Sequence, residues 1–123
     1  MITVYYRKTC SSSKRALEWM NEHHIDYQIH RVEQISREEL LYSLSLSENG
    51  LDDLVKLQGS AETLKKIKTL YGVKLNEALD YLKQHPEVLR TPIILTKNKL
   101  WVGYQEAEIR QFVPRSRRKQ HVI

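Results

Sequence analysis

Hydrophobic positions at the start of the chain change their spacing twice, which predicts a strand, a helix and a second strand. Residues 2–6 are rich in β-branched and aromatic side chains, which are typical of a short strand. After Cys10 and three serines, apolar positions recur every three to four residues as far as residue 23, which predicts an amphipathic helix beginning at the cysteine. Residues 25–30 alternate apolar and polar positions and predict a half-buried strand. The two strands bracket a helix of crossover length, so we expect them to be parallel.

The middle of the chain, residues 33–89, predicts helices only. Ser36 and Glu39 form a capping-box signal ahead of a leucine-rich run. A short extra turn is expected within residues 51–57. Two further helices are expected, one after a capping serine with a glycine in the left-handed conformation at its end, and one that stops at a proline. The first of these helices follows Ser60 and ends at Gly72, and its apolar stripe is Leu64, Ile67 and Tyr71. The second begins near Leu75 and ends before Pro86.

The last third of the chain returns to strand patterns. Residues 92–96 and 100–104 are apolar runs separated by three polar residues, which predicts a hairpin. A final helix is expected at residues 106–112. The hairpin would add antiparallel strands to the opening pair, so the sequence predicts an α/β fold with one mixed sheet. Residues 1–32 and 90–114 would form its core, residues 33–89 a helical insert, and residues 115–123 a basic tail.

Composition and charge narrow the function classes. Of 123 residues, 41% are hydrophobic and 28% charged, and no stretch approaches the roughly 20 apolar residues of a membrane span. The net charge of +5 comes mostly from Arg115, Arg117, Arg118 and Lys119, whereas residues 33–89 carry more acidic than basic groups. A broad DNA-binding face is therefore not expected, although the tail could contact phosphates non-specifically. The start of the chain lacks the pattern of a signal peptide, so we expect a cytoplasmic protein.

Cys10 is the candidate for reactive chemistry. As the single cysteine it cannot form an internal disulfide or a cysteine-based zinc site. At the start of a helix, near Lys14, its thiolate would be stabilised by unpaired backbone N–H groups and the positive end of the helix dipole. The alternative is that Cys10 is a small buried hydrophobe. Its polar neighbours favour an exposed or half-exposed thiol, and no metal or cofactor is expected.

Four segments carry a resemblance to a known family. Residues 4–14, 48–52, 85–94 and 102–115 resemble the arsenate reductase and Spx family, and the last segment resembles the Spx branch more closely. The resemblance covers nearly the whole chain. It implies a thioredoxin-like mixed sheet with an inserted helical lobe. It also implies a cis peptide between Thr91 and Pro92 that faces Cys10.

The arsenate reductase branch implies an enzyme in which a cysteine thiolate attacks an arsenate oxyanion held by arginines. In this chain Thr91 precedes the proline where the reductases have an arginine, Gln58 occupies the place of a second arginine, and Lys14 that of a third. Lysine keeps the charge but lacks the planar fork that binds oxyanions bidentately. If the protein were an enzyme, Cys10, Lys14 and Arg90 would be its catalytic residues. With those arginines missing, we do not expect an enzyme.

The Spx branch implies a regulator that binds the C-terminal domain of the RNA polymerase α subunit during stress. Gly50 would be a contact residue, with Glu48 and Asp52 beside it, although an Asn-Gly pair is also a common helix stop. Many Spx proteins carry a Cys-x-x-Cys switch, whereas this chain has Cys10 and Ser13. Its activity would then follow its abundance, the interpretation we favour, or a reversible capping of Cys10. We expect a monomer that contacts promoter DNA only through the complex or the tail.

Overall fold

The structure, a computed structural model, describes residues 2–104 of the chain. Four strands and five α-helices lie within this range, with two short 3₁₀ helices, η1 and η2. In chain order the elements are β1 (Ile2–Tyr6), α1 (Ser11–Glu22), β2 (Tyr27–Arg31), η1 (Val32–Gln34), α2 (Arg37–Leu46), α3 (Leu51–Leu54), α4 (Ala61–Leu70), α5 (Leu75–Gln84), η2 (Pro86–Val88), β3 (Ile93–Leu95) and β4 (Leu100–Val102).

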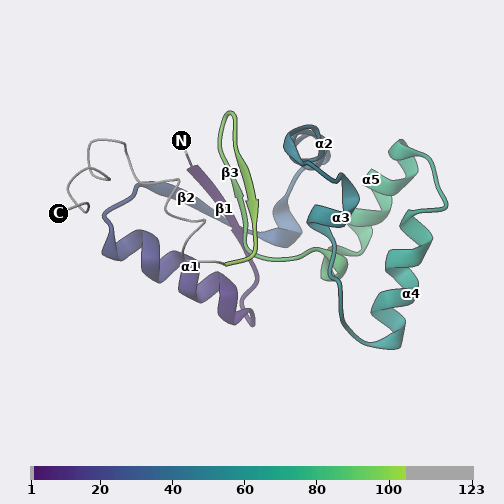
Figure 1. The fold of residues 1–123 in the computed structure, drawn as a ribbon, viewed down its shortest axis with the longest axis horizontal. Coiled ribbons are helices and arrows are strands. Elements are labelled where there is room, and N and C mark those ends of the chain that lie inside the picture. Colours follow the sequence, from purple (N-terminus) through teal and green to yellow (C-terminus); the bar gives the residue numbers. More distant parts are fainter. Residues whose placement is uncertain (1, 105–123) are drawn as a thin grey trace.

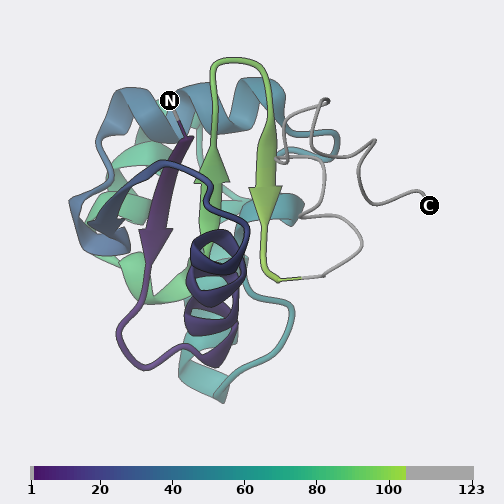
Figure 2. The same cartoon turned by 90° about the vertical axis from the view of Figure 1, so that its left-hand side faces the viewer.

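The strands form one mixed sheet in the order β2-β1-β3-β4. β1 pairs with β2 in parallel and with β3 antiparallel, and β3 pairs antiparallel with β4. Helix α1 covers one face of this sheet, and the helices of the middle segment lie on the opposite side (Figures 1 and 2). The predicted α/β class and thioredoxin-like arrangement are confirmed.

Alternate residues of the central strands divide the interior into two clusters. Val4 and Ile94 are register partners and pack with Ala16, Trp19 and Met20 of α1. Their neighbours Tyr5 and Ile93, also register partners, belong to the cluster that includes α2, α4 and α5. This follows from the pleat, because successive side chains of a strand point to opposite faces. The helical segment therefore has its core against the sheet, while the exact division into core and insert stays a prediction.

The second strand differs from its prediction in bounds and burial. It runs from residue 27 to 31 rather than from 25 to 30, and Ile25 is buried just before it. Ile29 was expected on a buried face, yet it is 45% exposed. The physical reason is position, because β2 is the edge strand and four of its five residues are exposed.

The helices of the middle segment have the N-caps that the sequence predicts, but the end of α4 differs from its prediction. The Ser36 hydroxyl accepts from the backbone N–H of Glu39, and the Glu39 carboxylate accepts from that of Ser36, both at 3.0 Å, so the capping box is confirmed. The short turn predicted within residues 51–57 is α3, and the Ser60 cap of α4 is present. The expected left-handed Gly72 is wrong, because among described glycines only Gly50 and Gly103 have positive φ.

The apolar stripe of α4 is also shifted from its prediction. Ile67 is buried as expected, but Leu64 and Tyr71 are exposed, and Leu70 takes the inward position. The predicted helix at 106–112 and the tail at 115–123 lie outside the described residues. Within residues 2–104 we find no helix with the length and apolar character needed to span a membrane.

Two adjacent leucines of α2 test the assignment of the core. Leu40 is fully buried, whereas Leu41 is 44% exposed. Leu40→Ala should lower the free energy of unfolding by about 2–5 kcal/mol, because it removes buried methyl groups and leaves a cavity. Leu41→Ala removes the same atoms from a half-solvated site and should cost less than about 1 kcal/mol. Urea unfolding measures both, and equal losses would contradict the assignment.

Candidate functional site

Cys10 stands between the end of β1 and the start of α1, where it is the N-cap residue of the helix. The turn before it is closed by a hydrogen bond from the Cys10 backbone N–H to the Arg7 carbonyl at 3.0 Å. The side chain is half-buried, and its Sγ donates to the carbonyl oxygen of Thr91 at 3.5 Å. The Thr91–Pro92 peptide bond is cis. The thiol therefore lies against the loop that leads into β3.

Several hydrogen-bond donors converge on this thiol. Burial raises the pKa of Cys10, but hydrogen bonds from the hydroxyls of Ser13 and Thr91 and from the backbone N–H groups of Ser13 and Ser12 outweigh burial. Together they hold the pKa of Cys10 below its ordinary value. Ser13 is itself fully buried, so its hydroxyl is fixed near the sulfur. The site favours a thiolate without a second cysteine.

A pocket of about 440 Å³ opens beside Cys10 and has basic walls. Arg7, Lys56 and Arg90 line it together with Thr91 and Cys10. Burial and the positive charge of Arg7 lower the pKa of Lys56, as expected where cations gather. The sequence pointed to Arg90 but also to Lys14, which is exposed on α1 and is not among the residues that line the pocket. It missed Arg7, although this residue begins the turn that ends at Cys10, and it missed Lys56, which no local pattern connects to Cys10.

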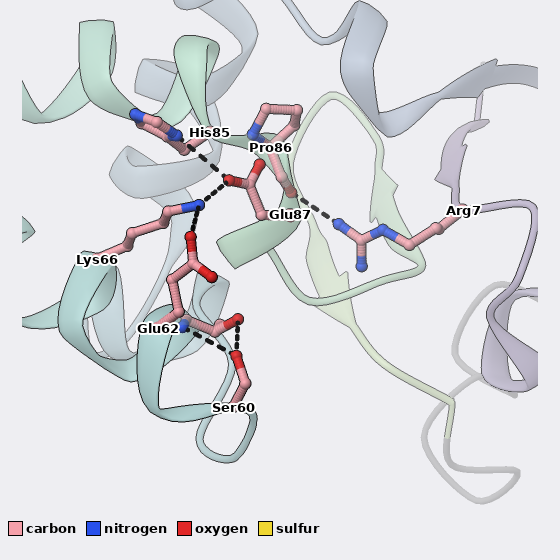
Figure 3. Close-up of polar contacts among 8 residues, drawn as sticks. Arg7, Ser60, Glu62, Lys66, His85, Pro86 and Glu87 are labelled. Atoms are coloured by element: carbon pink, nitrogen blue, oxygen red, sulfur yellow. Dashed lines mark hydrogen bonds and ion pairs between the residues drawn. The ribbon is translucent and has the colours of Figure 1, made fainter.

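The guanidinium of Arg7 is occupied by the protein's own backbone. Its Nη2 donates to the carbonyl of Pro86 at 2.7 Å (Figure 3). Its Nη1 donates to the carbonyl of Leu89 at 3.1 Å. Nη1 also lies 3.5 Å from the Thr91 hydroxyl. Arg7 thus ties the end of β1 to the segment preceding β3, which leaves its planar fork less able to bind a ligand.

The same segment is held from the side of α4. Glu87 accepts from the Lys66 ammonium at 3.0 Å and lies 3.2 Å from the His85 ring nitrogen (Figure 3). Burial raises the pKa of Glu87, but the hydrogen bond from Lys66, with smaller contributions from the Glu87 backbone and His85, lowers it overall. Arg7 and Lys66 therefore bind residues 86–89, which lead to Thr91, from two different segments of the chain.

Gly50 lies in the helical segment, at the N-cap of α3. Its φ of +63° and ψ of −131° belong to a backbone conformation that favours glycine. The alternative interpretation, a glycine that stops the preceding helix, is wrong, because α2 ends at Leu46 with Ser47 as its C-cap. A Cβ at Gly50 would have no atom of residues 2–104 within 4 Å. A side chain at Gly50 would therefore meet strain from the backbone conformation rather than a clash with the described residues.

The residues beside Gly50 are acidic. Glu48 and Asp52 are exposed, and the Asp52 carboxylate accepts a hydrogen bond from the Tyr71 hydroxyl at the end of α4. Burial and this bond raise the pKa of Tyr71 to about 12. Arg90 lines a second groove, of about 360 Å³, together with Glu48, Asp53 and Trp101. Arg90 therefore lines both the Cys10 pocket and this second groove. Gly50, Glu48 and Asp52 are not among the residues that line the Cys10 pocket.

Comparison with known proteins places this geometry in a family. Residues 5–112 match the model described as the ArsC family. The chain belongs to the ArsC family. Within the family it is of the Spx type. It is 34% identical to the global transcriptional regulator Spx of Streptococcus pneumoniae over 99% of this chain and 92% of that protein. The corresponding protein of Streptococcus mutans is 32% identical over 99% of this chain and 90% of that protein.

Solved structures of the ArsC family share the fold. A putative ArsC family related protein from Bacteroides fragilis superposes with a TM-score of 0.77 and 20% identity, covering 90% of this chain and 96% of that one. The arsenate reductase from Vibrio cholerae gives a TM-score of 0.65 and 19% identity over 90% of this chain and 93% of that one. At these identities the likeness concerns the fold alone.

Two serines of the first turn of α1 test the cause of the lowered Cys10 pKa. Ser13→Ala removes a hydroxyl that donates to the sulfur and should raise the pKa of Cys10. Ser11→Ala alters an exposed serine in the same turn and should leave it unchanged. The rate of alkylation by iodoacetamide as a function of pH reports the thiolate fraction. Coincident profiles for the two variants would mean that Ser13 does not stabilise the thiolate.

Proposed function

We propose that this ArsC-family protein is a cytoplasmic, Spx-like transcriptional regulator that binds the C-terminal domain of the RNA polymerase α subunit. The observation that carries the proposal is the match to proteins named global transcriptional regulator Spx over 99% of this chain. The docking surface is the loop around Gly50, with Glu48 and Asp52. The open position of the Gly50 Cα and the exposure of its acidic neighbours support this choice.

The composition of the Cys10 pocket supports a regulator over a reductase. An arsenate reductase needs free cations around a dianionic substrate. Here Thr91 and Gln58 stand where the resemblance implies arginines, and the guanidinium of Arg7 is bound to backbone carbonyls. Lys56 and Arg90 remain, and one of them is a lysine without a fork. The second candidate, a thiol-dependent arsenate reductase using Cys10, rests on the lowered pKa of this thiol and the basic pocket.

Regulation cannot use a disulfide within the chain, because Cys10 is the single cysteine. We propose that the protein acts as a monomer whose effect follows its abundance, and that any contact with promoter DNA comes through the polymerase complex or residues 115–119. Reversible capping of Cys10 by a small thiol is the alternative. Thiol-specific mass spectrometry of the protein from stressed cells separates the two modes.

Two substitutions at Gly50 test the docking surface. Both Gly50→Ala and Gly50→Arg impose a side chain on a positive φ and should lower stability similarly, by about 1–2 kcal/mol. Only arginine adds bulk and charge at the surface. We expect calorimetric titration with the isolated α C-terminal domain to show wild-type-like binding for Gly50→Ala within about fivefold, and a loss of more than about a hundredfold for Gly50→Arg. A wild-type-like affinity of Gly50→Arg would exclude Gly50 as a contact.

The reductase alternative has its own assay. Arsenate-dependent oxidation of a coupled thiol system should stay far below the ordinary enzyme turnover of about 1 per second. A Cys10→Ser variant gives the background rate. A wild-type rate near 1 per second that Cys10→Ser abolishes would make the protein a reductase, whatever its binding to polymerase.

A further inference from the structure

The loop that carries Gly50, residues 47–50, is held by hydrogen bonds within this chain. Residues 47–50 connect α2 to α3 and belong to neither helix. Loops of this kind are mobile unless side chains satisfy their backbone groups. The backbone N–H groups of Glu48 and Asn49 both have partners here, and the partner is the same side chain in each case, that of Asp53.

Asp53 directs both carboxylate oxygens into this loop. Its Oδ2 accepts from the backbone N–H of Glu48 at 3.0 Å and from that of Asn49 at 2.9 Å. Its Oδ1 accepts from the side-chain amide of Asn49 at 3.2 Å. Three hydrogen bonds to one ionised group are stronger than neutral ones and fix the loop relative to α3. The Asp53 carboxylate is thus bonded to the loop, while the side chains of Glu48 and Asp52, which both precede it in the sequence, are exposed.

The surroundings of Asp53 keep its carboxylate ionised. The backbone N–H of Asn49 lowers the pKa of Asp53, burial opposes this, and the Asn49 side chain, the Glu48 backbone and the charge of Arg90 lower it further. Arg90 and Asp53 line the same groove. At neutral pH the carboxylate is therefore fully charged and can keep all three bonds.

We propose that Asp53 is a positioning residue that presets the Gly50 loop for docking without touching the partner itself. The inference rests on the proposed function, which supplies the partner. A preset loop binds more tightly because less conformational entropy is lost when the complex forms. Removing Asp53 should then weaken docking although the contact residues Glu48, Gly50 and Asp52 are all intact.

Three variants test the role in binding. Asp53→Ala removes all three bonds, Asp53→Asn keeps an acceptor oxygen but loses the charge, and Asp26→Ala removes a charge from an exposed site before β2 as a control. In titrations with the isolated α C-terminal domain we expect about a tenfold loss of affinity for Asp53→Ala, a smaller loss for Asp53→Asn, and a change within twofold for Asp26→Ala. Equal affinity of Asp53→Ala and wild type would overturn the proposal.

A measurement on the free protein tests whether Asp53 holds the loop, independently of binding to the partner. Amide hydrogen exchange of Glu48 and Asn49, followed by NMR, should quicken at least tenfold in Asp53→Ala, while the amides of β1 stay protected. Unchanged exchange at Glu48 and Asn49 would overturn the positioning role. If the wild-type protein fails to bind the domain at all, the proposed function fails, whereas exchange still decides whether Asp53 holds the loop. Should Asp53→Ala not fold, Asp53→Asn provides both readouts.

Discussion

The arrangement of both candidate surfaces depends on a short pairing of backbone between residues 54–56 and 88–90. The backbone N–H of Lys56 donates to the Val88 carbonyl at 2.9 Å, and that of Arg90 donates to the Leu54 carbonyl at 2.8 Å. Val55 and Leu89 between them are buried and form an isolated β-bridge. Buried backbone groups require such partners, so this pairing fixes the end of α3 to the approach of β3. One side of the junction continues to Thr91 at the thiol, and the other leads back through α3 to Gly50.

The elements that the sequence predicted well are those whose signals are local. The Ser36 capping box and the helix beginning at Cys10 each depend on residues within one or two turns. Local signals fail where tertiary position decides. Ile29 alternates like a buried residue but lies on the edge strand, and Gly72 follows a helix that closes with Tyr71 in the right-handed conformation. Local propensity indicates which backbone conformations have a low energy for a residue, but tertiary contacts decide which of them the residue adopts.

The candidate site was only half predictable for a related reason. Cys10 and its serines form one sequence motif, so the tendency toward a thiolate follows from the helix start. Arg7 and Lys56 reach the pocket from different segments, and the role of Arg7 depends on its hydrogen bond to Pro86, 79 residues away in the sequence. Lys14 is near Cys10 in sequence, but its place on α1 turns it to solvent. Two cations near Cys10 in sequence thus differ, because Arg7 in the loop before the helix lines the pocket whereas the helix directs the Lys14 side chain away from it.

Charged side chains lie on both sides of the backbone pairing between residues 54–56 and 88–90, basic ones near Cys10 and an acidic one near Gly50. On the thiol side, Arg7, Lys56 and Arg90 make the pocket basic, but the fork of Arg7 is bound to the carbonyls of Pro86 and Leu89. A guanidinium whose N–H groups are bonded to backbone carbonyls stabilises the fold and has fewer donors left for a reacting oxyanion. On the loop side, Asp53 is likewise bound to backbone. The most strongly engaged charges therefore hold segments in place, which suits a docking scaffold better than a catalytic centre.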